Sequence, residues 1–307
     1  MDDPGFLLQA HHAAFGQTKT AGDLAAAQRH AEAVLALYRP ELHAEHALVY
    51  GGHDPGSCAR VGVALTLLLR GFPDQSRRQS ERALALAREL PHLPSLAHAL
   101  QNVAELHNLR REPAATAALA ADLLPLAAQH GSAVGTANAT MLRGWARVML
   151  GRSAEGLDDL REGLRLWRET GSRLFVPYRL GIVADALAAA GRREEALGLL
   201  DEAVEATELI GERWFEAELH RLKGEVLRSL PGDRRDEADV CFRQALAVAQ
   251  GQGARFLELR TLVSLARIRC DNGRPDEARA LLAPVCARFS EGFDTPDLQE
   301  AKALLDE

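Results

Sequence analysis

The sequence predicts an all-α protein built as a right-handed α-solenoid, an array of about seven repeated helix pairs. Small residues recur with a period of about 40, at Ala64, Ala104, Gly144, Ala184, Gly224 and Ala266. A second series repeats where helices should end, at Gly71, Arg111, Gly151, Gly191, Gly232 and Gly273. Self-similarity at a fixed period of roughly 20–50 residues indicates a repeat array.

The composition supports helix packed on helix. Of the 307 residues 47% are hydrophobic and only 5% aromatic, with many Ala and Leu. Both are good helix formers, and small side chains let helices approach closely. In a solenoid the chain length reflects the number of repeats and not the number of domains, so we expect one domain over residues 1–307. The net charge of −7 argues against a nucleic-acid partner, which needs clustered Lys and Arg.

The helix pairs are expected to start near residues 6, 56, 93, 133, 173, 212 and 254. The first pair is followed by the one irregularity, an insertion at 39–57 that stretches the interval from Gly22 to Gly71 to 49 residues. A long connection inside a compact array is more often functional than idle.

The fifth pair shows the expected pattern most clearly. Leu180, Val183 and Leu187 have helical spacing in the first helix. Gly191 then offers the left-handed conformation that ends a helix, and the second helix stops at Gly211. The pairs before and after it follow the same pattern. The last stretch starts with Thr-Pro-Asp and predicts a polar capping helix at about 295–306.

These small residues resemble the tetratricopeptide repeat (TPR) family. The resemblance rests on Ala184, Gly191, Ala196 and Ala203 in the fifth pair, Gly224, Ala238 and Ala245 in the sixth, and Ala266, Gly273 and Ala278 in the seventh. It implies that the two helices of a pair cross where these side chains lie. Leu123 and Val285 depart from the pattern, and the period of 40 exceeds the family's usual 34.

A narrower resemblance is to the C-terminal repeat region of bacterial adenylate or guanylate cyclase-like and other signalling proteins with a STAND-type ATPase. It rests on stretches such as YGGHDPGSCARVGVALTLLLRGFPDQS and AELHRLKGEVL. The sequence contains no G-x-x-x-x-G-K-[ST] phosphate loop, so we expect neither the ATPase nor the effector in this chain.

The TPR resemblance implies that the first helix of each pair lines a concave groove. Projected on the 40-residue period, the middle of that groove would contain His98, Gln101, Glu105, Asn138, Met141, Trp145, Tyr178 and Asp185. Convergent polar groups beside aromatic surface are typical of a ligand site. The alternative is a hydrated groove in which Trp145 and Tyr178 only pack between neighbouring helices.

Towards the C-terminal end the projected groove becomes charged, with Glu218, Arg221, Arg260 and Arg267. The three arginines could clamp the acidic tail of a partner. Alternatively, the charges form exposed ion pairs, which contribute little to stability.

The 39–57 insertion supplies further candidates, namely Tyr50, His53, Asp54 and the adjoining Cys58. His43, His46 and His53 could hold a metal such as zinc, but a structural zinc site has four ligands at tighter spacing. Asp54-Pro55 is also an ordinary helix start. We therefore predict no metal and no cofactor. A thiol–imidazole pair of Cys58 with His53 or His98 is possible, but packing is the favoured role of this cysteine.

The sequence predicts no enzyme, because it lacks a nucleophile elbow, HExxH and a dinucleotide fingerprint. Scattered cysteines without CxxC spacing indicate a reducing compartment. No stretch is apolar enough to span a membrane, and the N-terminus does not resemble a signal peptide. We expect a cytoplasmic protein without membrane partners.

The function that these observations favour is a binding scaffold or sensor that uses its concave groove in a bacterial signalling or regulatory system. Its partner would be a protein or a peptide. The alternative is a small-molecule receptor with a closed pocket formed by the groove and the 39–57 insertion. A metal-binding or enzymatic role for the histidine-rich insertion is a third hypothesis.

Overall fold

The computed structural model describes residues 3–43 and 45–306, and all regular structure in these ranges is helical. The predicted all-α fold class is confirmed. Residues 1, 2, 44 and 307, which belong to the predicted domain, lie outside the described residues.

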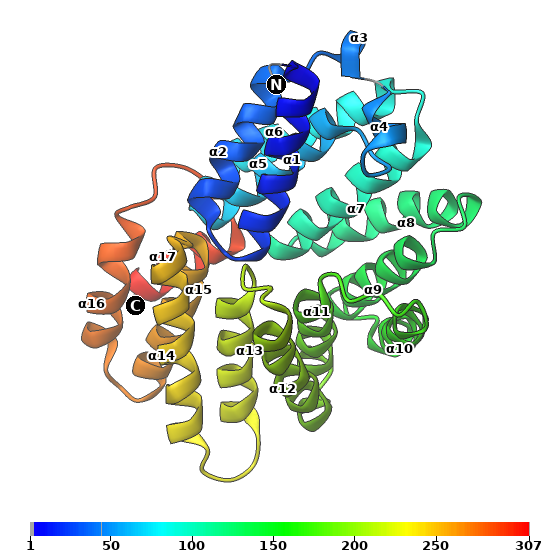
Figure 1. Ribbon diagram of the computed structural model, residues 1–307. Coiled ribbons are helices and arrows are strands. Elements are labelled where there is room, and N and C mark those ends of the chain that lie inside the picture. Colours follow the sequence, from blue (N-terminus) through cyan, green and yellow to red (C-terminus); the bar gives the residue numbers. More distant parts are fainter. Residues whose placement is uncertain (1–2, 44, 307) are drawn as a thin grey trace. The chain divides into compact units, whose positions relative to one another are not determined.

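The helices form the expected succession of pairs (Figure 1). The pairs are α1 (Pro4–Thr20) with α2 (Leu24–Leu37), α5 (Pro55–Leu69) with α6 (Pro73–Glu89), α7 (Leu93–Leu109) with α8 (Pro113–Gln129), α9 (Ala133–Met149) with α10 (Ser153–Glu169), α11 (Val176–Ala189) with α12 (Arg193–Ile210), α13 (Glu216–Ser229) with α14 (Arg235–Gln252), and α15 (Arg255–Asp271) with α16 (Pro275–Cys286). The final helix is α17 (Pro296–Asp306). Each observed start lies within a few residues of its prediction.

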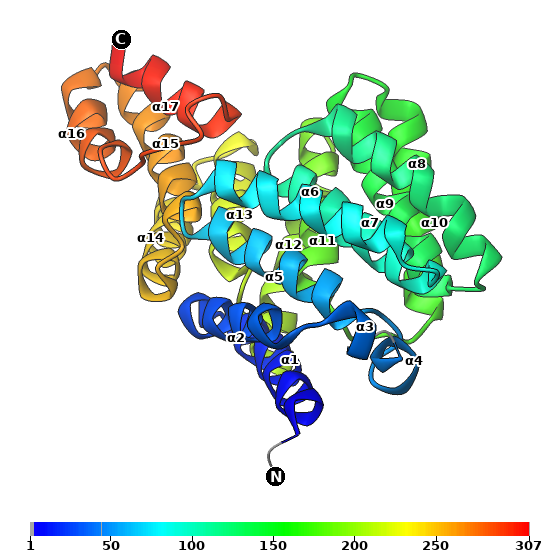
Figure 2. The same cartoon turned by 90° about the horizontal axis from the view of Figure 1, so that it is seen from above.

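The chain divides into two compact units. The first comprises Met1–Leu67 and Gln75–Leu174, and the second Leu68–Asp74 and Phe175–Glu307. In the first unit α7, α8, α9 and α10 pack in chain order (Figure 2). In the second, α11 to α16 pack in the same way and α17 covers α15 and α16. One domain over residues 1–307 stays a prediction.

The periodic small residues lie where paired helices cross. A Cβ atom on Gly144 of α9 would come within 2.9 Å of the Gly156 carbonyl oxygen on α10. On α13, a Cβ on Gly224 would come within 2.8 Å of the Phe242 ring of α14. The alanines of the same series are fully buried, namely Ala64, Ala104, Ala184 and Ala266. Larger residues at these positions would separate the helices of a pair.

The second periodic series marks the turns inside the pairs. All six residues have left-handed backbone conformation: Gly71, Arg111, Gly151, Gly191, Gly232 and Gly273. Glycine adopts this region without a Cβ clash, which explains its recurrence. Arg111, with φ of 59°, is the position where the chain places a larger residue in this strained conformation.

The 39–57 insertion contains two single-turn helices, α3 (Pro40–His43) and α4 (His46–Val49). Its irregular part stops at Asp54, because residues 55–57 already belong to α5. The Asp54 carboxylate accepts the Ser57 N–H (2.7 Å) and so caps this helix. The Tyr38 hydroxyl donates to the same carboxylate, also at 2.7 Å. The helix-start interpretation of Asp54-Pro55 is confirmed, and these bonds fix the end of the insertion against α5.

Gly151→Ala tests the turn conformation. Nothing lies within 4 Å of a Cβ placed at this position, so the substitution adds backbone strain alone. We expect the free energy of unfolding to fall by about 1 kcal/mol, measured by urea denaturation.

Gly198→Ala is the matched control. Gly198 lies inside α12, has open space around its Cβ position and no left-handed backbone. Alanine is the better helix former there, so this variant should gain roughly 0.5–1 kcal/mol. Equal effects of the two substitutions would contradict the assigned turn geometry.

Candidate binding site

The first unit contains a cavity of about 240 Å³ between the end of the insertion and three helical segments. Its walls come from the segment before α5, from α7, from α8, and from the α8–α9 turn with the first residues of α9. They comprise Gly52, His53, Pro94, Ala97, His98, Gln101, Leu123, Ala127, His130, Ser132 and Gly135.

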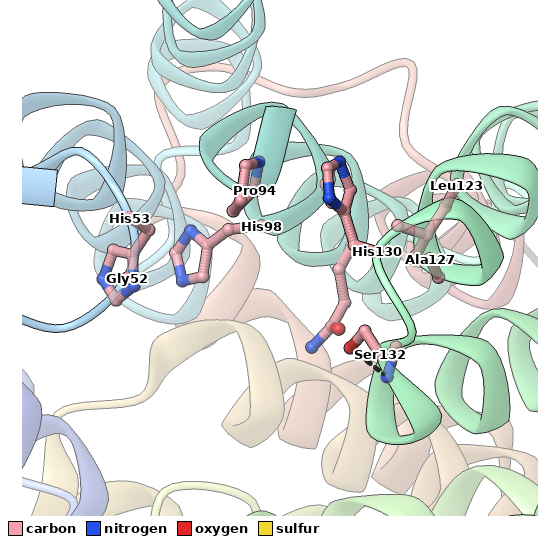
Figure 3. Close-up of a pocket in the computed structure, with 11 residues that line it drawn as sticks. Gly52, His53, Pro94, His98, Leu123, Ala127, His130 and Ser132 are labelled. Carbon is pink, nitrogen blue, oxygen red and sulfur yellow. Dashed lines mark hydrogen bonds between the residues drawn. The ribbon is translucent and has the colours of Figure 1, made fainter. Parts of the chain in front are cut away.

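The cavity has polar and apolar lining residues, with His53 and His98 at one end and the α8 residues Leu123 and Ala127 at the other, next to His130 and Ser132 (Figure 3). At one end the His53 and His98 rings stack in parallel, with centroids 3.9 Å apart. At the other end Ser132 accepts the Gly135 N–H at 3.1 Å and so starts α9. Leu123 and Ala127 of α8 form the apolar wall. Neutral hydrogen-bonding groups beside apolar surface suit an amphipathic side chain or small ligand.

Three of the residues selected from sequence meet here, namely His53, His98 and Gln101. Gln101 extends from the cavity into a chain of hydrogen bonds on the same helices. Its amide donates to the Glu105 carboxylate (3.3 Å), and Asn138 of α9 donates to the same oxygen (2.8 Å). Glu105 and Asn138 therefore join α7 to α9 beside the cavity, and Asn138 is fully buried.

Other residues predicted to line an open groove are buried. Met141, Trp145 and Tyr178 expose at most 2% of their surface. Tyr178 packs against Trp214 and Phe215, with ring centroids 5.2 and 5.1 Å away. This burial corrects the expectation of groove exposure and matches the alternative in which the aromatics pack between helices. The sequence period predicts which helix a residue lies on, but it does not predict how far neighbouring helices bury that residue.

The remaining candidates of the insertion have separate roles. Asp54 is buried and caps α5, and Cys58 is buried on that helix. Tyr50 is 39% exposed, and its ring lies 5.1 Å from that of His46. Leu48 and Val49 of α4 are mostly exposed.

A second cavity of about 230 Å³ borders α4. Its walls include Ala47, Leu48, Pro91 and His92. Ser95 of α7 also lines it, so both cavities combine the insertion with the start of α7.

The charged candidates form an internal network in the second unit. Arg260, only 6% exposed, makes a bidentate contact with Asp297 of α17 at 2.7 and 3.1 Å. It also donates to Glu218 at 3.3 Å. Arg221 binds the same Glu218 carboxylate at 2.8 and 3.0 Å. The arginines are thus paired within the unit, and the central pair is buried, contrary to the expected exposed ion pairs.

The outer members of this region are half-buried. Arg267 pairs with Glu300 of α17 and, at 3.8 Å, with Glu225. Asp185 lies on α11 near Arg221, whose charge it helps to stabilise. Because α17 supplies acidic partners for Arg260 and Arg267, these two arginines are paired inside the unit. Their role as a clamp for the acidic tail of a partner stays a prediction.

The structure also assembles a cluster that the sequence did not reveal. One donor atom each of His12, His53 and Cys58 lies within 4.8 Å of the others. Burial lowers the pKa of His12 to about 4, with a further contribution from His53. Burial also lowers the pKa values of His53 and His98 and raises that of the Cys58 thiol to about 12. No spacing rule finds this cluster, because His12 lies on a different helix pair.

No family model matches the chain. A curated protein of Rhizobium meliloti, described as uncharacterized, is 29% identical over 273 residues, which are 89% of this chain. The chain spans about a quarter (26%) of that relative's length.

Two structures of Rap proteins show the fold. The apo form of RapI aligns with a TM-score of 0.55 and 12% identity, covering 98% of this chain and 94% of RapI. A Rap protein complexed with Competence and Sporulation Factor gives 0.55 and 10%, covering 97% and 96%. A Pyrococcus horikoshii STAND protein with a tetratricopeptide repeat sensor gives 0.49 and 12%, covering 99% and 49%. The chain has a TPR-like α-solenoid fold. None of the described helices combines the length and apolar character that a membrane crossing requires.

The half-buried histidines His12, His53 and His98 predict a loss of stability in acid. Their folded-state pKa values lie below the unfolded value of about 6.5, so the unfolded chain binds more protons as the pH falls from 6.5 towards 4. We expect the metal-free protein to lose on the order of 1 kcal/mol per pH unit for each such histidine. Urea midpoints in chelator at pH 7.5 and 5.5 measure this loss, and His98→Gln should make it shallower. Identical pH dependence in wild type and variant would contradict the assignment.

Asp297→Ala tests the buried network. It leaves the Arg260 guanidinium buried without its bidentate partner, and we expect a loss of about 3–5 kcal/mol in unfolding free energy. Asp158→Ala is the control, because Asp158 is 77% exposed in its pair with Arg161 and should cost less than about 1 kcal/mol. Similar losses from both variants would contradict the role given to burial.

Proposed function

We propose that this chain is a non-catalytic binding module whose first unit holds an extended segment of a partner protein. One side chain of that segment enters the cavity between the insertion and α7. The observation that carries the proposal is this cavity, because His53, His98 and Gln101 converge there beside the apolar wall of Leu123 and Ala127.

The cavity's size favours a side chain over a whole small molecule. Its volume of about 240 Å³ is below the roughly 300–1,000 Å³ typical of small-molecule pockets. The exposed Leu48 and Val49 and the second cavity extend the available surface along the insertion. A peptide can use such separate points at once, with one side chain in each.

The lining also indicates the chemistry of the bound side chain. Among the described residues around the cavity, none is Lys, Arg, Asp or Glu. Burial lowers the pKa values of His53 and His98, which keeps both rings neutral near pH 7. A charged side chain of the partner, whether a carboxylate or an ammonium group, would therefore meet no opposite charge among these lining residues. An uncharged amphipathic side chain such as Tyr, Gln or Met fits this lining best.

The comparisons support a binding role by analogy of fold. A Rap protein with a similar fold is complexed with Competence and Sporulation Factor. By that analogy the module acts as a cytoplasmic sensor in a bacterial signalling or regulatory system. The Rhizobium meliloti relative is longer, which is compatible with such a module working beside other domains.

A small-molecule receptor is the second candidate. Gly52 and His53 of the insertion join groove residues of α7 around one cavity, as that hypothesis expects. A ligand that binds the native state alone would raise the melting temperature.

Peptides selected from a random library on the immobilised chain test the proposal. Ala97→Phe fills the cavity without removing a hydrogen-bonding group, and we expect at least about tenfold weaker binding by fluorescence anisotropy, roughly 1.4 kcal/mol. Ala121→Phe places the same group on the exposed face of α8 and should leave the affinity unchanged.

Equal binding to both variants would overturn the peptide site. A thermal-shift screen of metabolites with the same two variants examines the receptor. Stabilisation of wild type and Ala121→Phe, but not of Ala97→Phe, would favour the small-molecule alternative.

A further inference from the structure

The cluster of His12, His53 and Cys58 brings together three strong metal-binding groups from distant parts of the first unit. His12 lies on α1, His53 precedes α5, and Cys58 is in the first turns of α5. Their donor atoms lie within 4.8 Å of one another, and Cys58 is buried. One of these groups, Nε2 of His53, is buried without a hydrogen-bond partner, and burying such a group costs free energy unless another group or ion binds it.

Both histidines are oriented by hydrogen bonds from their other ring nitrogen. Nδ1 of His12 lies 3.3 Å from the Gln9 side-chain oxygen. The His53 ring bonds with the Gly51 backbone, while its Nε2 is buried without a hydrogen-bond partner. Histidines that bind metal almost always use the second nitrogen in this way, which fixes the tautomer and directs the free lone pair.

The ring arrangement is close to that of two imidazoles on one ion. The centroids of the His12 and His53 rings are 5.4 Å apart, and the rings are nearly perpendicular. Two imidazoles on a tetrahedral zinc ion have centroids roughly 5 Å apart, given metal–nitrogen bonds of about 2.0–2.1 Å. Donor atoms on such an ion are roughly 3.5 Å apart, so closure needs side-chain shifts on the order of 1 Å.

We propose that His12, His53 and Cys58 form a binding site for one zinc ion. Two neutral imidazoles and a thiolate are ligands that zinc favours. The Cys58 thiol gives up its proton to solvent when the sulfur binds the metal. Three protein ligands leave a fourth position for water or an incoming group, as in zinc sites that exchange a ligand.

The other histidines of the insertion are engaged differently. Nδ1 of His43 accepts the Arg39 N–H at 2.9 Å, and Nδ1 of His46 lies 2.8 Å from the Gln9 amide nitrogen. The zinc set therefore differs from the His43, His46 and His53 combination considered from sequence. Zinc would tie α1 to the start of α5 whether or not the cavity binds a peptide, so this inference does not rest on the proposed function.

Calorimetric titration of ZnCl₂ into the tag-free, reduced and chelator-treated full chain tests the site. We expect one ion per chain and a loss of at least about 100-fold in affinity for Cys58→Ser and for His12→Gln. With Co²⁺ as the probe, wild type should show a near-ultraviolet thiolate-to-cobalt charge-transfer band that Cys58→Ser lacks.

Three controls make the result decisive. Cys241→Ser removes a buried thiol of the second unit, and a His43→Gln/His46→Gln double variant removes two neighbouring imidazoles; both should keep the affinity and the band. Circular dichroism of each metal-free variant verifies folding, and half-buried His12 gives a second variant should Cys58→Ser not fold. Absence of stoichiometric zinc, or equal affinity in the ligand and control variants, would overturn the proposal.

Discussion

The close crossing of paired helices is the constraint on which the rest of the structure depends. At Gly144 the neighbouring backbone leaves no room for even a methyl group, and at Gly224 an aromatic ring fills that place. Each crossing must be followed by a tight reversal, which the left-handed residues of the turns supply. Because contact and turn recur every 40 or so residues, each pair presents its first helix in an equivalent way. The 39–57 insertion lies between the first two pairs of this regular frame.

The fold was predictable because it follows from short-range sequence signals that recur in each repeat. Gly191 and Gly273 end helices by backbone conformation, and Ala184 and Ala266 mark crossings by size. Even Arg111, which breaks the glycine series, keeps the left-handed conformation because the frame around it requires that turn. The division into two compact units had no comparable signal, since it depends on contacts summed over many helices.

The site was predictable only in part. His98 and Gln101 follow from the period and His53 from the irregular spacing, and these three meet at one cavity. The extent of burial could not be foreseen. Tyr178 is covered by Trp214 and Phe215, which directly precede α13 of the next pair. Partners far apart in the sequence could not be foreseen either: Arg260 pairs with Asp297 of the capping helix, and Cys58 lies near His12 of the first helix. Periodicity predicts which face of a helix a residue occupies. The burial of that residue and its ion-pair partners depend on the side chains of other helices that pack against the same face.

The first unit concentrates the features that suit binding. It holds both cavities, the exposed apolar residues of α4 and the histidine–cysteine cluster, and all but one of the eleven histidines precede residue 131. The polar candidates of the second unit are instead engaged in ion pairs that stabilise it, with the Arg260–Asp297 contact at their centre. The features proposed for recognition and the network around Arg260 therefore lie in different units of the chain.

Hydrogen–deuterium exchange of the full chain, with and without a selected peptide, measures most directly where binding occurs. On peptide binding we predict slower exchange in residues 45–54, at the start of α7 and at the α8–α9 turn, with little change in α13 to α17. Slower exchange confined to α13 to α17 would contradict it.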